Sequence, residues 1–152
     1  MRKTQSRQRR DSAYPRTTLA AIHAPWVCGV VVLAESDPVM RRQLSDVLRS
    51  DGCAVVEVED GQRLLDVLAS EILYPHPIDL IISDAGEAGM EVLAGLRRAD
   101  WTTPIIMISP EGDENCRRAA RRLGADAVFG LPFEMDDFRT AVHHLKEHGG
   151  AY

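Results

Sequence analysis

The chain has 152 residues, 45% of them apolar and 27% charged, so length and composition fit one globular domain and exclude collagen-like or low-complexity chains. The net charge of −5 is uneven, because residues 1–26 carry six Lys/Arg and one acid, whereas residues 27–152 carry twelve Lys/Arg and twenty-two acids. The acidic body argues against direct binding to nucleic acid or to an anionic membrane surface.

Residues 1–26 are interpreted as a disordered basic tail, because residues 1–17 are polar and show no apolar periodicity. Such a tail is either a nucleic-acid or membrane-surface arm or a solvated extension. The apolar run from Leu19 to Ala34 loosely resembles a secretory signal. A histidine, a proline and a tryptophan interrupt that run, and cleavage near Ala34 would remove the first expected core strand.

From Val27 onward, short β-branched runs alternate with helical patterns. The continuous apolar run Val27–Ala34 (VCGVVVLA) is typical of a strand buried on both faces. Asp37 is expected to cap the next helix, with Pro38 at its first position, and Asp51 and Gly52 to end it. Further strands are expected at Cys53–Val58, Ile78–Ser83, Pro104–Ile108 and Ala127–Phe129.

Four more helices follow from apolar spacing, the second of them stopped by the turn Tyr74–Pro77. Their expected inward residues are Leu64, Leu65, Leu68 and Ile72; then Met90, Val92, Leu93 and Leu96; then Ala119, Ala120 and Leu123; and finally Phe138, Val142 and Leu145. The fourth helix is expected over Asp113–Leu123, closed by Gly124.

These five β–α units predict an α/β fold. We expect a flavodoxin-like (βα)5 open parallel sheet, in the order 2-1-3-4-5, with helices on both faces. The domain would span residues 27–148, leaving a short C-terminal tail at 149–152. Ligands of such sheets bind at the carboxyl ends of the strands, near the switch point between strands 1 and 3.

Polar side chains gather at that edge in the predicted topology. Glu35, Ser36 and Asp37 follow the first strand, Asp84 follows the third, and Ser109 ends the fourth. Carboxylates held close together either include a raised-pKa acid or recruit a hard cation such as Mg²⁺. An Asp beside Mg²⁺ can attack phosphorus and form an acyl phosphate. The simpler alternatives are that Asp37 only caps a helix and that Asp84 is a turn residue.

At these residues the chain resembles the receiver domain of two-component response regulators. The resemblance runs from about Val27 to His148, through the segments VVLAESDPVMRR, IDLIISD, TPIIMIS and RRLGADAVFGLPF. It implies that Asp84 accepts phosphate and that Ser109 is the switch hydroxyl. It also implies a Mg²⁺ site at Glu35 and Asp84, with Asp37 and the Gly86 backbone as further candidate ligands, and a cis peptide bond before Pro132.

The chain departs from the family pattern, which marks it as an atypical, degenerate member. Ser36 replaces the second acid of the pair, Leu131 replaces the lysine, and Val128 replaces the switch aromatic. The loop from Asp84 to Gly89 is about three residues shorter than the resemblance implies. We therefore expect slow, strongly Mg²⁺-dependent phosphorylation, or none.

The resemblance implies a stand-alone receiver in a phosphorelay, not an enzyme, which takes phosphate on Asp84 from a histidine kinase or phosphotransfer protein. A downstream protein would dock on the surface of the fourth helix, fifth strand and last helix, where Arg117, Arg118, Arg121 and Arg122 form a basic patch. The alternatives are a phosphorylation-independent pseudo-receiver acting as a protein-interaction module, and a Mg²⁺-dependent phosphatase on the same fold. Three cysteines without a CxxC pair favour reduced thiols and a cytoplasmic location.

Overall fold

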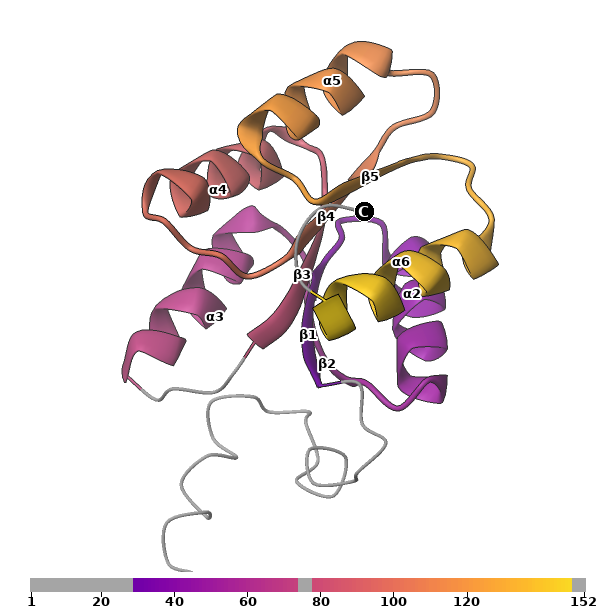
Figure 1. Cartoon of the computed structure of the whole chain (residues 1–152), viewed down its shortest axis with the longest axis horizontal. Helices are drawn as coiled ribbons and strands as arrows, with labels where there is room; N and C mark the ends of the chain where they lie inside the picture. Colours follow the sequence, from indigo (N-terminus) through magenta and orange to yellow (C-terminus); the bar gives the residue numbers. More distant parts are fainter. Residues whose placement is uncertain (1–28, 74–77, 149–152) are drawn as a thin grey trace, which may run out of the picture.

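The computed structural model describes residues 29–73 and 78–148, in which strands and helices alternate (Figure 1). The strands are Val30–Ala34 (β1), Ala54–Val58 (β2), Ile78–Asp84 (β3), Ile105–Ser109 (β4) and Ala127–Gly130 (β5). The helices are Pro38–Ser50 (α2), Gly61–Leu73 (α3), Glu87–Arg98 (α4), Glu114–Leu123 (α5) and Met135–His148 (α6). The expected tails at 1–26 and 149–152 and the turn at 74–77 lie outside the described residues.

The strands form one parallel sheet in the order β2-β1-β3-β4-β5, which confirms the predicted topology. Three strands, β3, β4 and β5, end one residue later than the sequence predicts, and the extra residues of β3 and β4 are polar. Asp84 pairs with Ile108 at the end of β3, and Ser109 pairs with Gly130 at the end of β4. The register therefore places Asp84 and Ser109 on adjacent strands at the same edge of the sheet.

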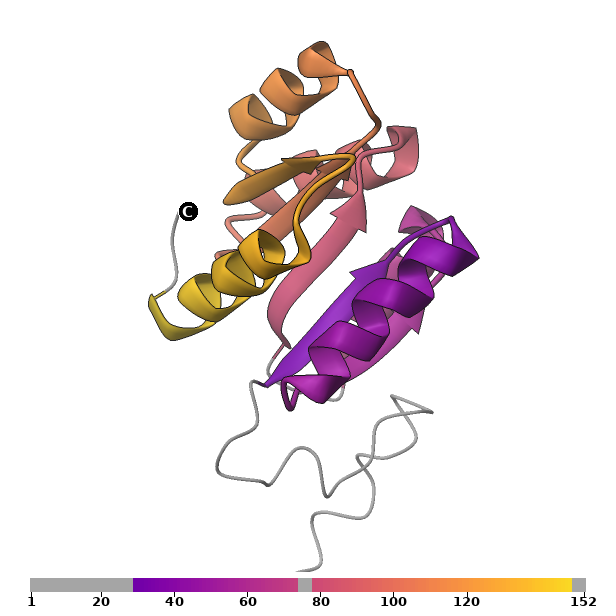
Figure 2. The same cartoon turned by 90° about the vertical axis from the view of Figure 1, so that its right-hand side faces the viewer.

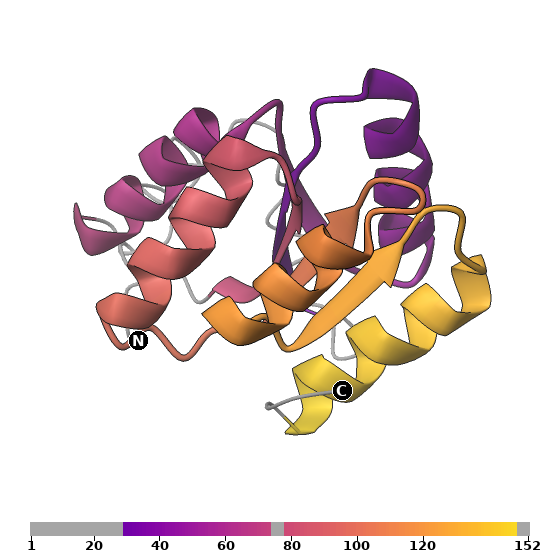
Figure 3. The ribbon, with the colours of Figure 1, turned by 90° about the horizontal axis from the view of Figure 1, so that it is seen from above.

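Helices cover both faces of the sheet, as predicted. Figures 2 and 3 show α2 and α6 on one side of the strands and α3, α4 and α5 on the other. Each layer closes its own apolar core, one around Leu64, Leu93 and Met107 and the other around Leu44 and Phe138. Because strand side chains alternate between faces, the buried strands contribute to both cores.

Two of the residues that were expected to point into the core do not do so. Leu65 and Leu123 are 43% and 37% exposed, so their predicted inward placement is wrong. Both lie at the border of the apolar stripe, where helical spacing alone does not separate a buried position from an exposed one. The side chain of Ile72 lies outside the described residues.

The helix ends follow the predicted capping chemistry. Asp37 accepts a hydrogen bond from the Val39 backbone N–H at 2.9 Å, and Pro38 occupies the first helical position of α2. Gly124 closes α5 with φ of 105°, a conformation that a side chain would strain. These caps fix where α2 begins after β1 and where α5 ends before β5.

The two cysteines in the described residues differ in their bonding state. Cys53 takes part in a disulfide bond, so the expectation of reduced thiols is wrong for this residue, whereas Cys116 is a free thiol. Burial raises the pKa of the Cys116 thiol, and the nearby Asp113 carboxylate adds to the effect.

Within residues 29–73 and 78–148, no helix has the length and apolarity needed to cross a bilayer.

Candidate functional site

Asp84 is the last residue of β3, at the carboxyl edge of the sheet and partly buried. The short connection to α4, only Ala85 and Gly86, brings the helix directly against the strand end. A side chain at Gly89 would collide with the Asp84 carbonyl and the Ser83 hydroxyl, so glycine permits this close approach. Only Ala85 and Gly86 separate the strand from the helix, because Glu87 to Gly89 of the expected loop belong to α4.

Ser36 holds one oxygen of the Asp84 carboxylate. Its backbone N–H and its hydroxyl both donate to Asp84 Oδ2, at 2.9 and 2.7 Å. Asp84 Oδ1 accepts no hydrogen bond from the described residues, and a side chain at Gly86 would begin 3.7 Å from it. One carboxylate oxygen is thus fixed, and the other is left without a partner within the described residues.

Glu35 lies beside this pair and is only 6% exposed. Burial raises the pKa of the Glu35 carboxyl from 4.5 to about 7, and the neighbouring Asp84 charge adds to the rise. The Asp37 backbone N–H donates to Glu35 Oε1 at 3.3 Å and opposes the shift. Glu35 Oε2 is buried and has no hydrogen-bond partner among the described residues. A proton or a cation would satisfy this oxygen.

Two other candidate ligands are engaged elsewhere. The Asp37 carboxylate caps α2 through Val39, as the simpler interpretation of the sequence held. Gly86 is the N-cap of α4, and its carbonyl accepts a hydrogen bond from the Met90 backbone N–H at 2.9 Å. Their roles as metal ligands stay predictions.

Ser109 is completely buried at the end of β4. Its hydroxyl donates to the Phe129 carbonyl across a long 3.5 Å, and its own carbonyl accepts from the Leu131 N–H at 3.1 Å. A weak hydroxyl contact of this length is easily exchanged for a better acceptor. Ser109 therefore lies one residue beyond the register partner of Asp84, with a hydroxyl that is held only by a long hydrogen bond.

The residue directly after β5 is not the lysine that the family pattern has at this position. Leu131 is a neutral side chain packed against the core layer of α2 and α6. The peptide bond between Leu131 and Pro132 is cis, as the resemblance implies. Sequence reasoning treated Ser36 only as a lost acid, and it missed the two hydrogen bonds to Asp84. The signal was its place directly after Glu35 at the switch point.

The carboxylates present fit a magnesium ion that is completed by phosphate and water. No group of three or more His, Cys, Asp or Glu side chains in the described ranges is arranged to hold a metal. Mg²⁺ in phosphate sites needs only one or two carboxylates, because waters and phosphate oxygens supply the rest. Glu35 and Asp84 provide two, and the unpartnered Glu35 Oε2 is an available ligand.

Fold and site together define a doubly wound α/β module with an acidic pair, a serine hydroxyl and one unpartnered aspartate oxygen at the switch-point edge. The family model of the response regulator receiver domain matches residues 31–143. The chain belongs to this family of two-component signalling proteins.

Individual relatives agree with this assignment. The chain is 33% identical over 113 residues to the transcriptional regulatory protein KdpE of Mycobacterium tuberculosis, covering 72% of this chain and 47% of the relative. It therefore spans about half the length of that regulator. It is 24% identical to sporulation initiation phosphotransferase F of Bacillus subtilis, covering 74% of this chain and 89% of the relative. The solved response regulator receiver protein of Burkholderia phymatum superposes with a TM-score of 0.68 at 28% identity, covering 82% and 99% of the two chains.

Proposed function

We propose that this receiver domain accepts a phosphoryl group on Asp84 and signals by changing its affinity for a protein partner. The observation that carries the proposal is the state of the Asp84 carboxylate. Ser36 fixes Oδ2 through two hydrogen bonds, and Oδ1 has no partner among the described residues. Such an oxygen is available to attack phosphorus.

In the proposed reaction, Asp84 Oδ1 attacks the phosphorus of a phosphohistidine on a histidine kinase or phosphotransfer protein. A P–O bond forms while the P–N bond breaks, and the imidazole nitrogen keeps the bonding electron pair. Ser36 holds the carboxylate in place during the attack. Mg²⁺, held by Glu35 and Asp84, would neutralise charge on the phosphoryl oxygens when bound.

Two features of the site set the expected rate. A phosphoryl group brings a charge of roughly −1.5 to −2 next to Glu35. Leu131 offers no ammonium to offset that charge, and Ser36 contributes a hydroxyl where a carboxylate ligand would strengthen metal binding. We therefore expect phosphorylation to be slow and to depend strongly on Mg²⁺.

The proposal is tested by incubating the full chain with Mg²⁺ and acetyl phosphate, followed by intact-protein mass spectrometry. We expect one phosphoryl adduct that is lost in base and on treatment with hydroxylamine, as a carboxylic–phosphoric anhydride requires. Asp84→Asn should abolish the adduct. Asp113→Asn makes the same chemical change at the exposed cap of α5, where asparagine caps equally well, and should leave the adduct intact.

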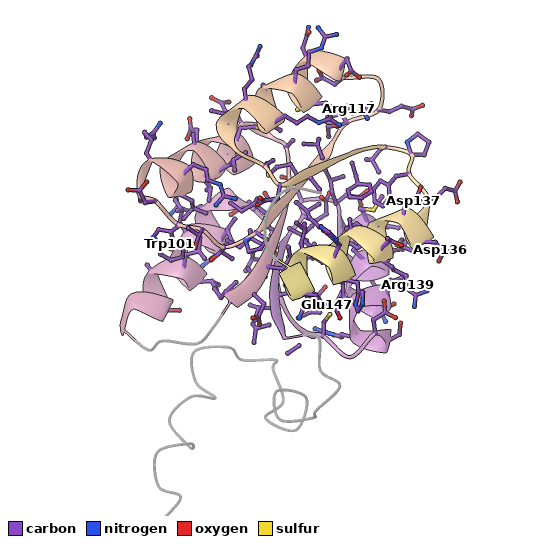
Figure 4. The ribbon with its side chains drawn as sticks, in the orientation of Figure 1. Trp101, Arg117, Asp136, Asp137, Arg139 and Glu147 are labelled. Atoms are coloured by element: carbon purple, nitrogen blue, oxygen red, sulfur yellow. The ribbon has the colours of Figure 1, made fainter. Side chains whose placement is uncertain are left out.

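The proposed output surface is formed by α5, β5 and α6. On α5 the side chains of Arg118, Arg121 and Arg122 are exposed, and no ion pair within the described residues engages them. Figure 4 shows Asp136 and Asp137 at the start of α6, so this surface carries both signs of charge. It would bind a downstream protein by charge complementarity.

The phosphorylation-independent pseudo-receiver is the other outcome of this test. It would give no adduct on Asp84 with any donor. It would also leave partner binding unchanged in Asp84→Asn.

A further inference from the structure

A phosphorylated Asp84 would need a positive charge close by, and Leu131 does not supply one. Two arginines lie near the carboxyl edge. Arg41 lies in α2 and already binds a backbone group, because its Nη1 donates to the Glu35 carbonyl at 2.8 Å. Arg117 lies on the other side, in α5.

Arg117 extends from α5 over the end of β5. A Cβ atom built on Gly130 would lie 3.2 Å from both Nε and Cζ of Arg117, so the guanidinium lies directly against this glycine. Figure 4 labels Arg117 where α5 faces β5. Because Gly130 has no side chain, the arginine occupies the space above the strand.

The sheet register relates this position to the phosphoacceptor. Gly130 pairs with Ser109, and the residue before Ser109 pairs with Asp84. Met107 packs in the core layer of α3, α4 and α5, so Ser109 faces that side, two residues further along β4. Asp84 follows Ile82, which packs in the other layer, so the guanidinium would reach Asp84 across the carboxyl end of β4. Gly130, against which Arg117 packs, therefore lies on the strand next to Ser109 and two strands, roughly 10 Å, from the Asp84 backbone.

The Arg117 side chain also has an unmet donor. Its Nε is buried and has no hydrogen-bond partner among the described residues. Its ion pair with Glu114, at 3.2 Å, joins two partly exposed side chains of one helix, and such pairs are weak. A dianion arriving at the edge can therefore compete for the guanidinium.

We propose, on the basis of the proposed phosphorylation of Asp84, that Arg117 replaces the missing lysine and pairs with the phosphoryl group. The guanidinium exchanges Glu114 for phosphoryl oxygens, and it reaches them past Ser109 from the β5 side. Its planar fork matches two phosphate oxygens at once. The receiver thus takes its positive charge from α5 and not from the residue after β5.

The experiment compares adduct formation from acetyl phosphate in full-length wild type, Arg117→Met, Arg117→Lys and Arg118→Met. Arg118 is the adjacent, exposed arginine of the same helix and serves as the matched control. We expect Arg117→Met to slow the reaction by about tenfold or more, since a hydrogen bond to a charged group is lost. Arg117→Lys should recover part of the rate, and Arg118→Met should not change it. Leu131→Lys should rescue Arg117→Met.

A second measurement requires no variant. Addition of Mg²⁺ and beryllofluoride, which mimics the phosphoryl group, should shift the Arg117 Nε–Hε NMR signal downfield as a new hydrogen bond forms. If the wild type forms the adduct but Arg117→Met reacts equally fast, or the Nε signal does not move, the role of Arg117 is refuted while that of Asp84 stands. If the wild type forms no adduct and shows no beryllofluoride shift, both proposals are overturned.

Discussion

Replacing Ser36 with aspartate puts a second carboxylate against Asp84 and tests how the site handles charge. Ser36 Oγ lies 2.7 Å from Asp84 Oδ2, so the new carboxylate would lie within about 4 Å of the old one. At an effective dielectric near 20, two charges at that distance repel by about 4 kcal/mol. Both side chains contact solvent, and screening reduces the effect to about 1–2 kcal/mol.

The measurement is the free energy of unfolding in urea, with a chelator and then with Mg²⁺. In chelator, Ser36→Asp should be less stable than Ser36→Asn by that amount, because asparagine has nearly the same shape without the charge. Mg²⁺ should remove the difference by binding the aspartate pair. Equal stability of the two variants in chelator, with no effect of Mg²⁺, would refute the claim that position 36 shares a charged site with Asp84.

Three further predictions follow from single side chains. Leu131→Lys should speed phosphorylation of Asp84 by acetyl phosphate in a gel-shift time course, and an unchanged rate would mean that a cation at this position does not reach the site. The pKa of Glu35 is about 7 in the folded protein and 4.5 without the fold, so protonation of Glu35 stabilises the folded state. The free energy of unfolding of the wild type, measured relative to Glu35→Gln in metal-free buffer, should therefore fall by about 3 kcal/mol as the pH rises from 4.5 through 7. A pH-independent difference between these two proteins would contradict the assignment. Arg97 donates to three backbone carbonyls and to an aspartate, so Arg97→Met should lower the free energy of unfolding by about 3 kcal/mol, whereas the exposed Arg98→Met should change it little, and equal losses would contradict the network.

The fold was predictable because its strands and caps are locally encoded. Apolar β-branched runs mark strands that are buried on both faces, and the sequence Asp37-Pro38 marks the start of a helix. Once the order of elements is known, the handedness of the crossovers leaves few topologies. The meeting of Glu35, Asp84 and Ser109 at one edge followed from that topology alone.

The finer features of the site depend on side-chain contacts between distant segments. The hydrogen bonds from Ser36 to Asp84 join residues 48 positions apart and require a particular side-chain orientation. Arg117 resembles its three neighbouring arginines in sequence, and only the glycine below it on β5 distinguishes its surroundings. Helical spacing likewise placed Leu123 inward, although it borders solvent. Such features arise from packing and not from local pattern.

The most direct test of the account is an NMR titration of the full chain with Mg²⁺ and beryllofluoride. If the carboxyl edge is a phosphoacceptor site, saturable shifts should appear in the backbone signals of Asp84 and Ser109 and require both reagents. Those shifts should be absent in Asp84→Asn. Backbone signals of both residues that do not shift in the wild type would contradict the central claim. Glu35, Asp84 and Ser109 would then share an edge of the sheet without forming a phosphate site.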